Sequence, residues 1–184
     1  TQLEMMYDPS SEHHLQERPS DSDLLMFGFY IRNNIGIGFR TFASGLLLGI
    51  GSAFFLVING VLLGGAAAHI DQVGFGSTFY SFIIGHGAFE LTAILLAGLA
   101  GIKLGVAILA PGRRTRFRAL VEEGKRSATI VYGFTAMLII AAFIEAFWSS
   151  STFIPVQVKL GIGAALWACV IGYFLIAGRG RAAR

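Results

Sequence analysis

Charged residues are scarce in this sequence. Lysine, arginine, aspartate and glutamate make up 14% of the 184 residues, whereas hydrophobic residues make up 54%. A soluble domain carries about 25% charged residues. The low charge and the mean hydropathy of +0.67 therefore exclude an ordinary soluble domain and indicate an integral membrane protein.

Acidic residues become rare after the beginning of the chain, and cysteine is nearly absent. Six of the eleven aspartates and glutamates fall in residues 1–23, which we predict to be a polar segment in water. The single Cys169 excludes an intrachain disulfide. Most basic residues cluster beside apolar runs, a pattern that indicates membrane orientation and gives no reason to expect a nucleic-acid partner.

Long apolar runs dominate the rest of the sequence. A helix needs about 20 apolar residues to cross a bilayer, and four runs are long enough, at about 41–70, 79–110, 127–148 and 156–178. The segment 24–38 carries Asn33 and Asn34, a candidate second polar cluster, and is predicted to be a partial or interfacial helix. We therefore expect an all-α, polytopic transmembrane helix bundle that forms one domain over residues 24–184 in the lipid bilayer.

Basic residues are missing from two of the predicted loops. Segments 71–78 and 149–155 contain neither lysine nor arginine, whereas loop 111–126 and the C-terminal tail are rich in them. Basic loops stay in the cytoplasm, so we predict a multi-pass protein of the cytoplasmic (inner) membrane with loop 111–126 and the C-terminal tail on the cytoplasmic side. Four crossings would place the start of the chain inside, whereas an additional partial pass through 24–38 would place residues 1–23 outside.

Polar residues interrupt the apolar spans at one common depth. Asn59, Glu90 and Glu145 each lie 19 or 20 residues from the predicted cytoplasmic end of their span, or roughly 28–30 Å at the rise of an α-helix. His86 lies four residues before Glu90 and on the same helix face. Ionisable groups are costly in hydrocarbon, so these four residues are predicted to form an intramembrane polar cluster.

Three hypotheses account for this cluster. It could be a hydrogen-bonded network that fixes helix packing, or it could line a water-filled pocket for a solute, a lipid headgroup or a proton. Alternatively, His86, Glu90 and Glu145 could hold a divalent metal ion and activate water for hydrolysis within the membrane. His69 is the only candidate for a second imidazole ligand near these residues.

Glycine is abundant inside the apolar spans. Small residues spaced four apart let helix backbones approach closely. Such a face serves either packing within one chain or formation of a homodimer. Three pairs have this spacing: Gly45 and Gly49, Gly60 and Gly64, and Gly101 and Gly105.

A combination of short motifs resembles the stage II sporulation protein M family of bacterial and archaeal membrane proteins. The motifs are Asn33-Asn34, Asn59-Gly60, HGAFELTAILLAGLAG at 86–101, Pro111-Gly112 and IEAF at 144–147. The resemblance covers about residues 24–180. Members of the family commonly carry a longer N-terminal part with another transmembrane helix, which would place residues 1–23 outside the cytoplasm.

The resemblance also implies a function. The namesake of the family is a membrane scaffold for a peptidoglycan-degrading machine, and relatives in non-sporulating bacteria are often encoded beside MoxR-type AAA+ ATPases. The His-Gly-x-x-Glu block at 86–90 places this chain closer to that second branch. We therefore expect a non-catalytic scaffold or assembly factor of envelope or peptidoglycan remodelling, without a cofactor, whose partners are envelope-remodelling proteins or an AAA+ ATPase.

Two other classes of function stay open at this point. One is a transporter or a lipid- or solute-binding protein that uses the polar cluster as its pocket. The other is an intramembrane metal-dependent hydrolase, for which the divalent metal would be the cofactor. The sequence shows no complete catalytic set, so an enzyme is the less favoured hypothesis.

Overall fold

Helices make up all of the regular structure in the described residues, which are 1–10 and 20–177 of the computed structural model. The arginines predicted to make the tail cytoplasmic lie outside these ranges. In chain order the elements are α1 (Gln2–Tyr7), α3 (Ser20–Ala43), the 3-10 helix η1 (Ser44–Leu46), α4 (Ile50–Gln72), α5 (Gly76–Leu109), α6 (Arg116–Phe143), the π-helix η2 (Ile144–Ser149) and α7 (Val156–Ile176).

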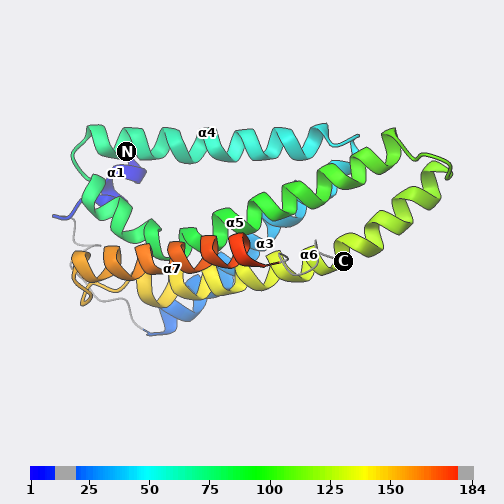
Figure 1. Ribbon diagram of the computed structural model, residues 1–184. Helices are drawn as coiled ribbons and strands as arrows, with labels where there is room; N and C mark the ends of the chain where they lie inside the picture. The colour runs from blue at the N-terminus through cyan, green and yellow to red at the C-terminus, as the bar shows by residue number, and fades with distance from the viewer. Residues whose placement is uncertain (11–19, 178–184) are drawn as a thin grey trace.

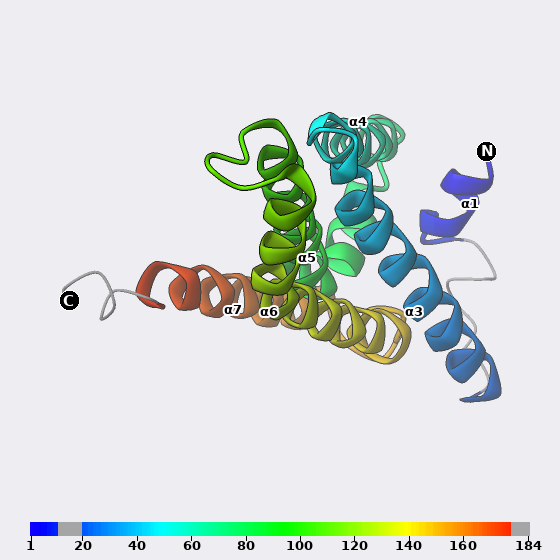
Figure 2. The same ribbon diagram turned by 90° about the vertical axis from the view of Figure 1, so that its right-hand side faces the viewer.

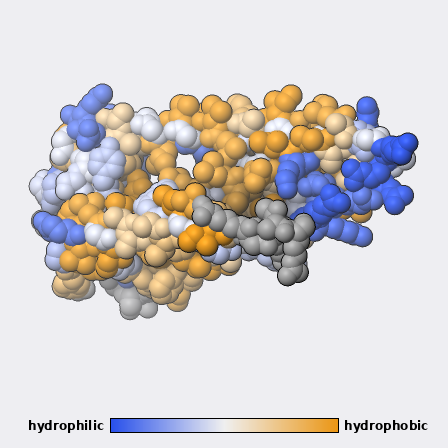
Figure 3. Space-filling view, viewed as in Figure 1, coloured by the Kyte–Doolittle hydropathy of each residue, from blue (hydrophilic) through white to orange (hydrophobic). Residues whose placement is uncertain are grey.

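The described helices form an elongated bundle (Figures 1 and 2). Four of them are long and apolar enough to cross a membrane: α4, α5, α6 continued by η2, and α7. Figure 3 shows an apolar surface along the middle of the bundle and hydrophilic residues gathered towards its two ends. The prediction of an all-α polytopic membrane protein is therefore confirmed.

The first and third spans begin at other residues than predicted. The first, expected from 41, begins at Ile50, because Leu48 and Gly49 take positive φ angles of 55° and 84° that break the helix. The third, expected from 127, begins at Arg116, where Thr115 caps the first turn. An ion pair of 2.9 Å between Arg118 and Glu122 supports these added turns, because residues four apart face each other on a helix.

Helix α3 extends the predicted partial helix at both ends and runs along the bundle. Its first half packs Tyr30 against Ala142 and Ala146, near the end of α6. Its last turns approach α5 at Gly101. Beside this glycine, the carbonyl of Thr41 accepts a hydrogen bond of 2.6 Å from Ser52 of α4. Although α3 is not apolar enough to rank with the four spans, it joins the two ends of the bundle (Figure 1).

Helix α5 is the centre of the bundle and is built largely from small residues. In its most apolar stretch of 18 residues, 50% of the residues are buried, compared with 11% in the corresponding stretches of α4 and α7. A Cβ atom at Gly101 would overlap Ser52 and the carbonyl of Phe42, and one at Gly105 would overlap the backbone of Gly49. The glycines of α5 thus let the turn between η1 and α4 lie directly on its backbone.

The start of the chain forms the short helix α1, which packs against the bundle. Tyr7 of α1 is 7% exposed and contacts Ile70 of α4 and Phe79 of α5. This contact places α1 at the end of the bundle where α4 passes into α5. We call this the α1 end, and the end containing 44–49 and 110–115 the opposite end.

The alternation of α3, α4, α5, α6 and α7 between the two ends makes a prediction about topology. In a Cys169→Ser background, cysteines introduced at Ser10 and Ser150 should react with a membrane-impermeant maleimide from the same side of the membrane. A cysteine at Gly112 should react only from the other side, which the basic loop predicts to be the cytoplasm. If the cysteines at positions 10 and 112 both react from the same side of the membrane in intact cells, this arrangement is contradicted.

The close approach at Gly105 makes a second prediction. Gly105→Ala should lower the free energy of unfolding by about 1–3 kcal/mol, because overpacking a tight contact strains the backbone. Gly133→Ala on α6 is the matched control, since nothing lies within 4 Å of the added methyl group. The control should leave stability unchanged or raise it by about 0.5–1 kcal/mol through helix propensity. Thermal unfolding in one detergent compares the two, and equal transitions would argue against the packing described.

Candidate intramembrane polar site

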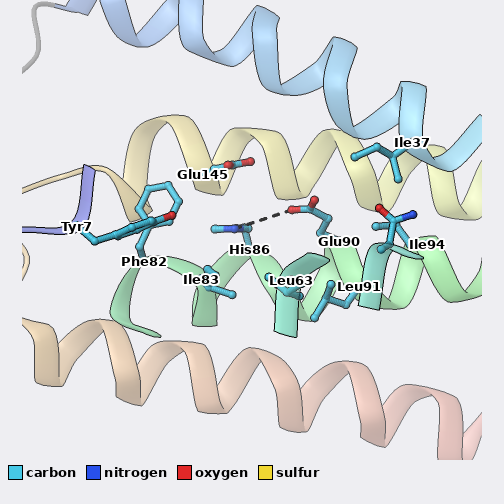
Figure 4. Close-up of a pocket in the computed structure, with 12 residues that line it drawn as sticks. Tyr7, Ile37, Leu63, Phe82, Ile83, His86, Glu90, Leu91, Ile94 and Glu145 are labelled. Carbon is cyan, nitrogen blue, oxygen red and sulfur yellow. Dashed lines mark ion pairs between the residues drawn. The ribbon is translucent and has the colours of Figure 1, made fainter. Parts of the chain in front are cut away.

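A polar cavity lies inside the bundle beneath α1. It has a volume of about 190 Å³ and is lined by residues of α1, α3, α4, α5 and η2. Most of the lining is apolar, but five lining residues carry polar groups: Tyr7, Asn59, His86, Glu90 and Glu145. Figure 4 shows His86 between Tyr7 on one side and Glu90 on the other, with Glu145 reaching in from the neighbouring helix.

His86 is held in a fixed orientation by α5 and η2. Its ring is 5% exposed, packs edge-on against Phe82 at 5.3 Å, and places Nδ1 3.1 Å from Oγ of Ser149. The preceding Gly85 makes this possible, because a side chain there would overlap the ring of Trp148. With one ring nitrogen engaged by Ser149, the other nitrogen, Nε2, faces Glu90.

Glu90 follows His86 by one helical turn. Its Oε2 lies 3.9 Å from Nε2 of His86, which is longer than a hydrogen bond. The two groups therefore face each other across a gap (Figure 4). Such a separation leaves room for a bridging ion or proton carrier between them.

Glu145 comes from the π-helix η2, which continues α6. Oε2 of Glu145 accepts a hydrogen bond of 3.4 Å from Nδ2 of Asn34 on α3, and Asn34 in turn accepts one of 3.2 Å from Nδ2 of Asn33. The two asparagines, predicted as a separate polar cluster, thus connect to Glu145. Single π-helical turns inside α-helices occur frequently at functional sites.

Together, the three ionisable residues form a compact set of potential metal ligands. Each of His86, Glu90 and Glu145 offers one atom, and these atoms lie within 4.8 Å of one another. One imidazole and two carboxylates can bind a cation or pass a proton between them. The described structure therefore brings together the three residues that the sequence singled out on two different spans.

Of the two remaining residues predicted from the sequence, Asn59 lies at the cavity and His69 lies outside it. Asn59 lines the same cavity, but its Nδ2 donates a hydrogen bond of 2.7 Å to the carbonyl of Phe55 on its own helix. His69 lies near the end of α4, where its Nε2 is 2.8 Å from Oε1 of Glu4. In the described chain His69 is thus engaged by α1 and is not one of the three grouped ligands.

Helix α1 covers the cavity at this end of the bundle. Tyr7 packs edge-on against Phe79 at 5.0 Å and Phe82 at 6.0 Å, and Glu4 binds His69 as described. Burial, and to a smaller extent the charge of Glu145, raises the pKa of Tyr7 to about 12.

Three residues that support the site were not predicted from the sequence. Ser149 orients His86, and Lys159 of α7, 8% exposed, donates a hydrogen bond of 2.7 Å from Nζ to the carbonyl of Ser149. Tyr7 was also missed, because it lies in the polar N-terminal segment. The signal for Lys159 was present, since a lysine one turn into an apolar span must find a polar partner.

These features define a class of protein: a polytopic helical membrane protein with an ionisable cluster inside its bundle. The chain belongs to the stage II sporulation protein M family, whose sequence profile matches residues 2–150. The matched region runs from α1 to η2 and includes every residue that lines the cavity. No curated protein and no solved structure matches the chain.

The position of α1 makes a prediction about access to the cavity. In the Cys169→Ser background, a cysteine at Asn59 should react slowly with a water-soluble thiol reagent. Tyr7→Ala should speed this reaction at least about tenfold, because truncation of a buried aromatic side chain costs about 3–5 kcal/mol and loosens α1. Tyr7→Phe, which keeps the ring, should react like the parent protein.

The matched control for this experiment is Met6→Ala. Met6 lies on the same short helix and is 45% exposed, so its truncation removes little packing. If Met6→Ala and Tyr7→Ala give the same labelling rate at position 59, α1 does not cover the cavity.

Proposed function

We propose that the protein is a non-catalytic membrane scaffold or assembly factor of envelope or peptidoglycan remodelling, and that it works as a homodimer joined through α4. Family membership supports the remodelling role. The single structural observation that carries the scaffold role is an unpartnered glycine face on α4. The two parts of the proposal can be tested together.

The three glycine pairs are used in two different ways. Gly45 and Gly49 meet Gly101 and Gly105 inside the chain, where the backbones touch. By contrast, nothing lies within 4 Å of a Cβ atom built at the third pair, Gly60 and Gly64, or at the adjacent Gly65. The same spacing that brings two backbones together inside the bundle is therefore exposed on α4.

The position of α4 makes this face accessible. The helix lies at the edge of the bundle in both views (Figures 1 and 2). Only 11% of its most apolar stretch of 18 residues is buried. In a bilayer the hydrophobic effect does not drive helices together, so close backbone packing of small residues supplies the association. A second copy of α4 offers the same small-residue surface in return.

The form of the chain suits an assembly role. From α3 to α7 the described helices are joined by turns of six residues or fewer, so partners meet mainly helix faces and the two ends of the bundle. The opposite end carries a cluster of exposed basic residues around 113–118. If this end is cytoplasmic, as the charge distribution predicts, it is where an AAA+ ATPase or another cytoplasmic partner would bind.

The transporter alternative has less support than the scaffold. Transport needs a pathway that can open to both sides of the membrane. The cavity lies towards the α1 end, with Tyr7 in its lining. The buried and close-packed centre of α5 lies between it and the opposite end.

Co-purification from native membranes tests the proposal. A tagged copy should recover a differently tagged second copy together with an envelope-remodelling protein or an ATPase. The double variant Gly60→Leu, Gly64→Leu should recover at least about tenfold less of the second copy. A loss of about 1.4 kcal/mol in the free energy of association changes the dimerisation equilibrium tenfold.

The control is the double variant Gly161→Leu, Gly172→Leu on α7. These glycines are equally open, so the control adds the same bulk to another peripheral helix and should keep the dimer. Equal loss in both variants would count against an interface on α4. Recovery of the protein alone, without a second copy or an envelope partner, would contradict the scaffold role itself.

A further inference from the structure

We propose that His86, Glu90 and Glu145 bind one divalent transition-metal ion in the cavity beneath α1. The scaffold role does not require this site, and the proposal stands apart from it. One imidazole nitrogen and two carboxylate oxygens are donors that zinc and similar ions accept in proteins.

The separation of the ligand atoms suits one ion. The three atoms lie within 4.8 Å of one another, whereas ligands of a tetrahedral zinc ion are about 3.4 Å apart, given bonds near 2.1 Å. Small rotations of the two glutamate side chains would shorten the distances between the ligand atoms to this value. Both side chains border open cavity space. His86 Nε2 already faces Glu90 across 3.9 Å, so the ion would lie between them.

Partners on other elements orient two of the three ligands. Ser149 engages Nδ1 of His86, so with the proton on Nδ1 the lone pair of Nε2 points to the ion position. Asn34 donates to one oxygen of Glu145. Protein metal sites typically fix the ring of a histidine ligand and the plane of a carboxylate ligand through such outer hydrogen bonds.

The charges of the two carboxylates call for a cation. Within residues 1–10 and 20–177, Glu90 has His86 as its only ion-pair partner, and no basic group lies within ion-pair distance of Glu145. The nearby Lys159 is directed at the carbonyl of Ser149. Two ionised carboxylates that share one cavity with a mostly apolar lining repel each other, and a divalent ion would neutralise both.

The site also has room for a further ligand. The cavity of about 190 Å³ extends from the three ligands to Asn59 and Tyr7, which is enough space for several water molecules. A metal ion here would tie α5 to η2 and leave one coordination position open towards the cavity. We therefore expect bound metal to stabilise the helix bundle.

Metal analysis of the purified full chain tests the site. The protein in lipid nanodiscs is stripped with a chelator, reloaded with Zn²⁺, passed through a desalting column and analysed for zinc. We expect about one equivalent, and zinc should raise the thermal unfolding temperature of the parent protein. Co²⁺ in place of zinc should give visible absorption bands that report the ligand geometry.

Three substitutions identify the ligands. His86→Ala and Glu145→Gln should each lose the equivalent of zinc, the cobalt bands and the zinc-dependent rise in unfolding temperature. His69→Ala is the matched control, because His69 binds Glu4 outside the cluster, and it should retain all three. Size-exclusion chromatography before metal loading shows whether each variant is folded.

Two results would overturn the proposal. One is a parent protein that binds far less than one equivalent and shows no zinc-dependent change in unfolding temperature. The sequence also carries two adjacent histidines, His13 and His14, in its N-terminal segment. The other result is zinc that persists in His86→Ala and disappears when these two histidines are both replaced by alanine, which would locate the metal in the N-terminal segment. Neither result bears on the α4 dimer, which is measured by recovery of a second copy.

Discussion

The approach of α5 to the turn between η1 and α4 is the contact on which the rest of the bundle depends. At Gly101 and Gly105 the backbone of α5 touches the segment that connects α3 to α4. A single added carbon atom on either glycine would overlap that segment or the adjoining ends of α3 and α4. This contact fixes where α3 ends and where α4 turns back. It thereby sets the positions of α3 and α4 on either side of α5, and the polar cavity lies between them at the other end.

The cavity shows how a membrane protein accommodates ionisable side chains. The three central groups come from α5 and η2, and their partners come from α3 and from the end of η2. Hydrogen bonds between different helices both satisfy polar groups and fix helix positions. Among the described residues, the exception is the shortage of cationic partners for Glu90 and Glu145, and this shortage is the observation behind the proposed cation site.

Several features could be predicted from the sequence because they depend on periodicity and rise alone. The convergence of Glu90 and Glu145 followed from counting residues along straight helices, and His86 followed from its spacing to Glu90. The role of Asn59 could not be predicted, because it depends on a rotamer: its amide turns back to Phe55. The hydrogen bond from Asn34 to Glu145 depends on the path of α3. The partly polar sequence of α3 does not show that this helix runs along the bundle.

The π-helix η2 has a consequence for comparing this protein with its relatives. A residue removed between Phe143 and Glu145 would rotate the following side chains by about 100° around the helix axis, and Glu145 would no longer face His86. Helical phase, rather than the presence of a glutamate, therefore decides whether a relative has the same site. An alignment that pairs the IEAF motifs but shifts the length of α6 by one residue would match the letters and miss the geometry.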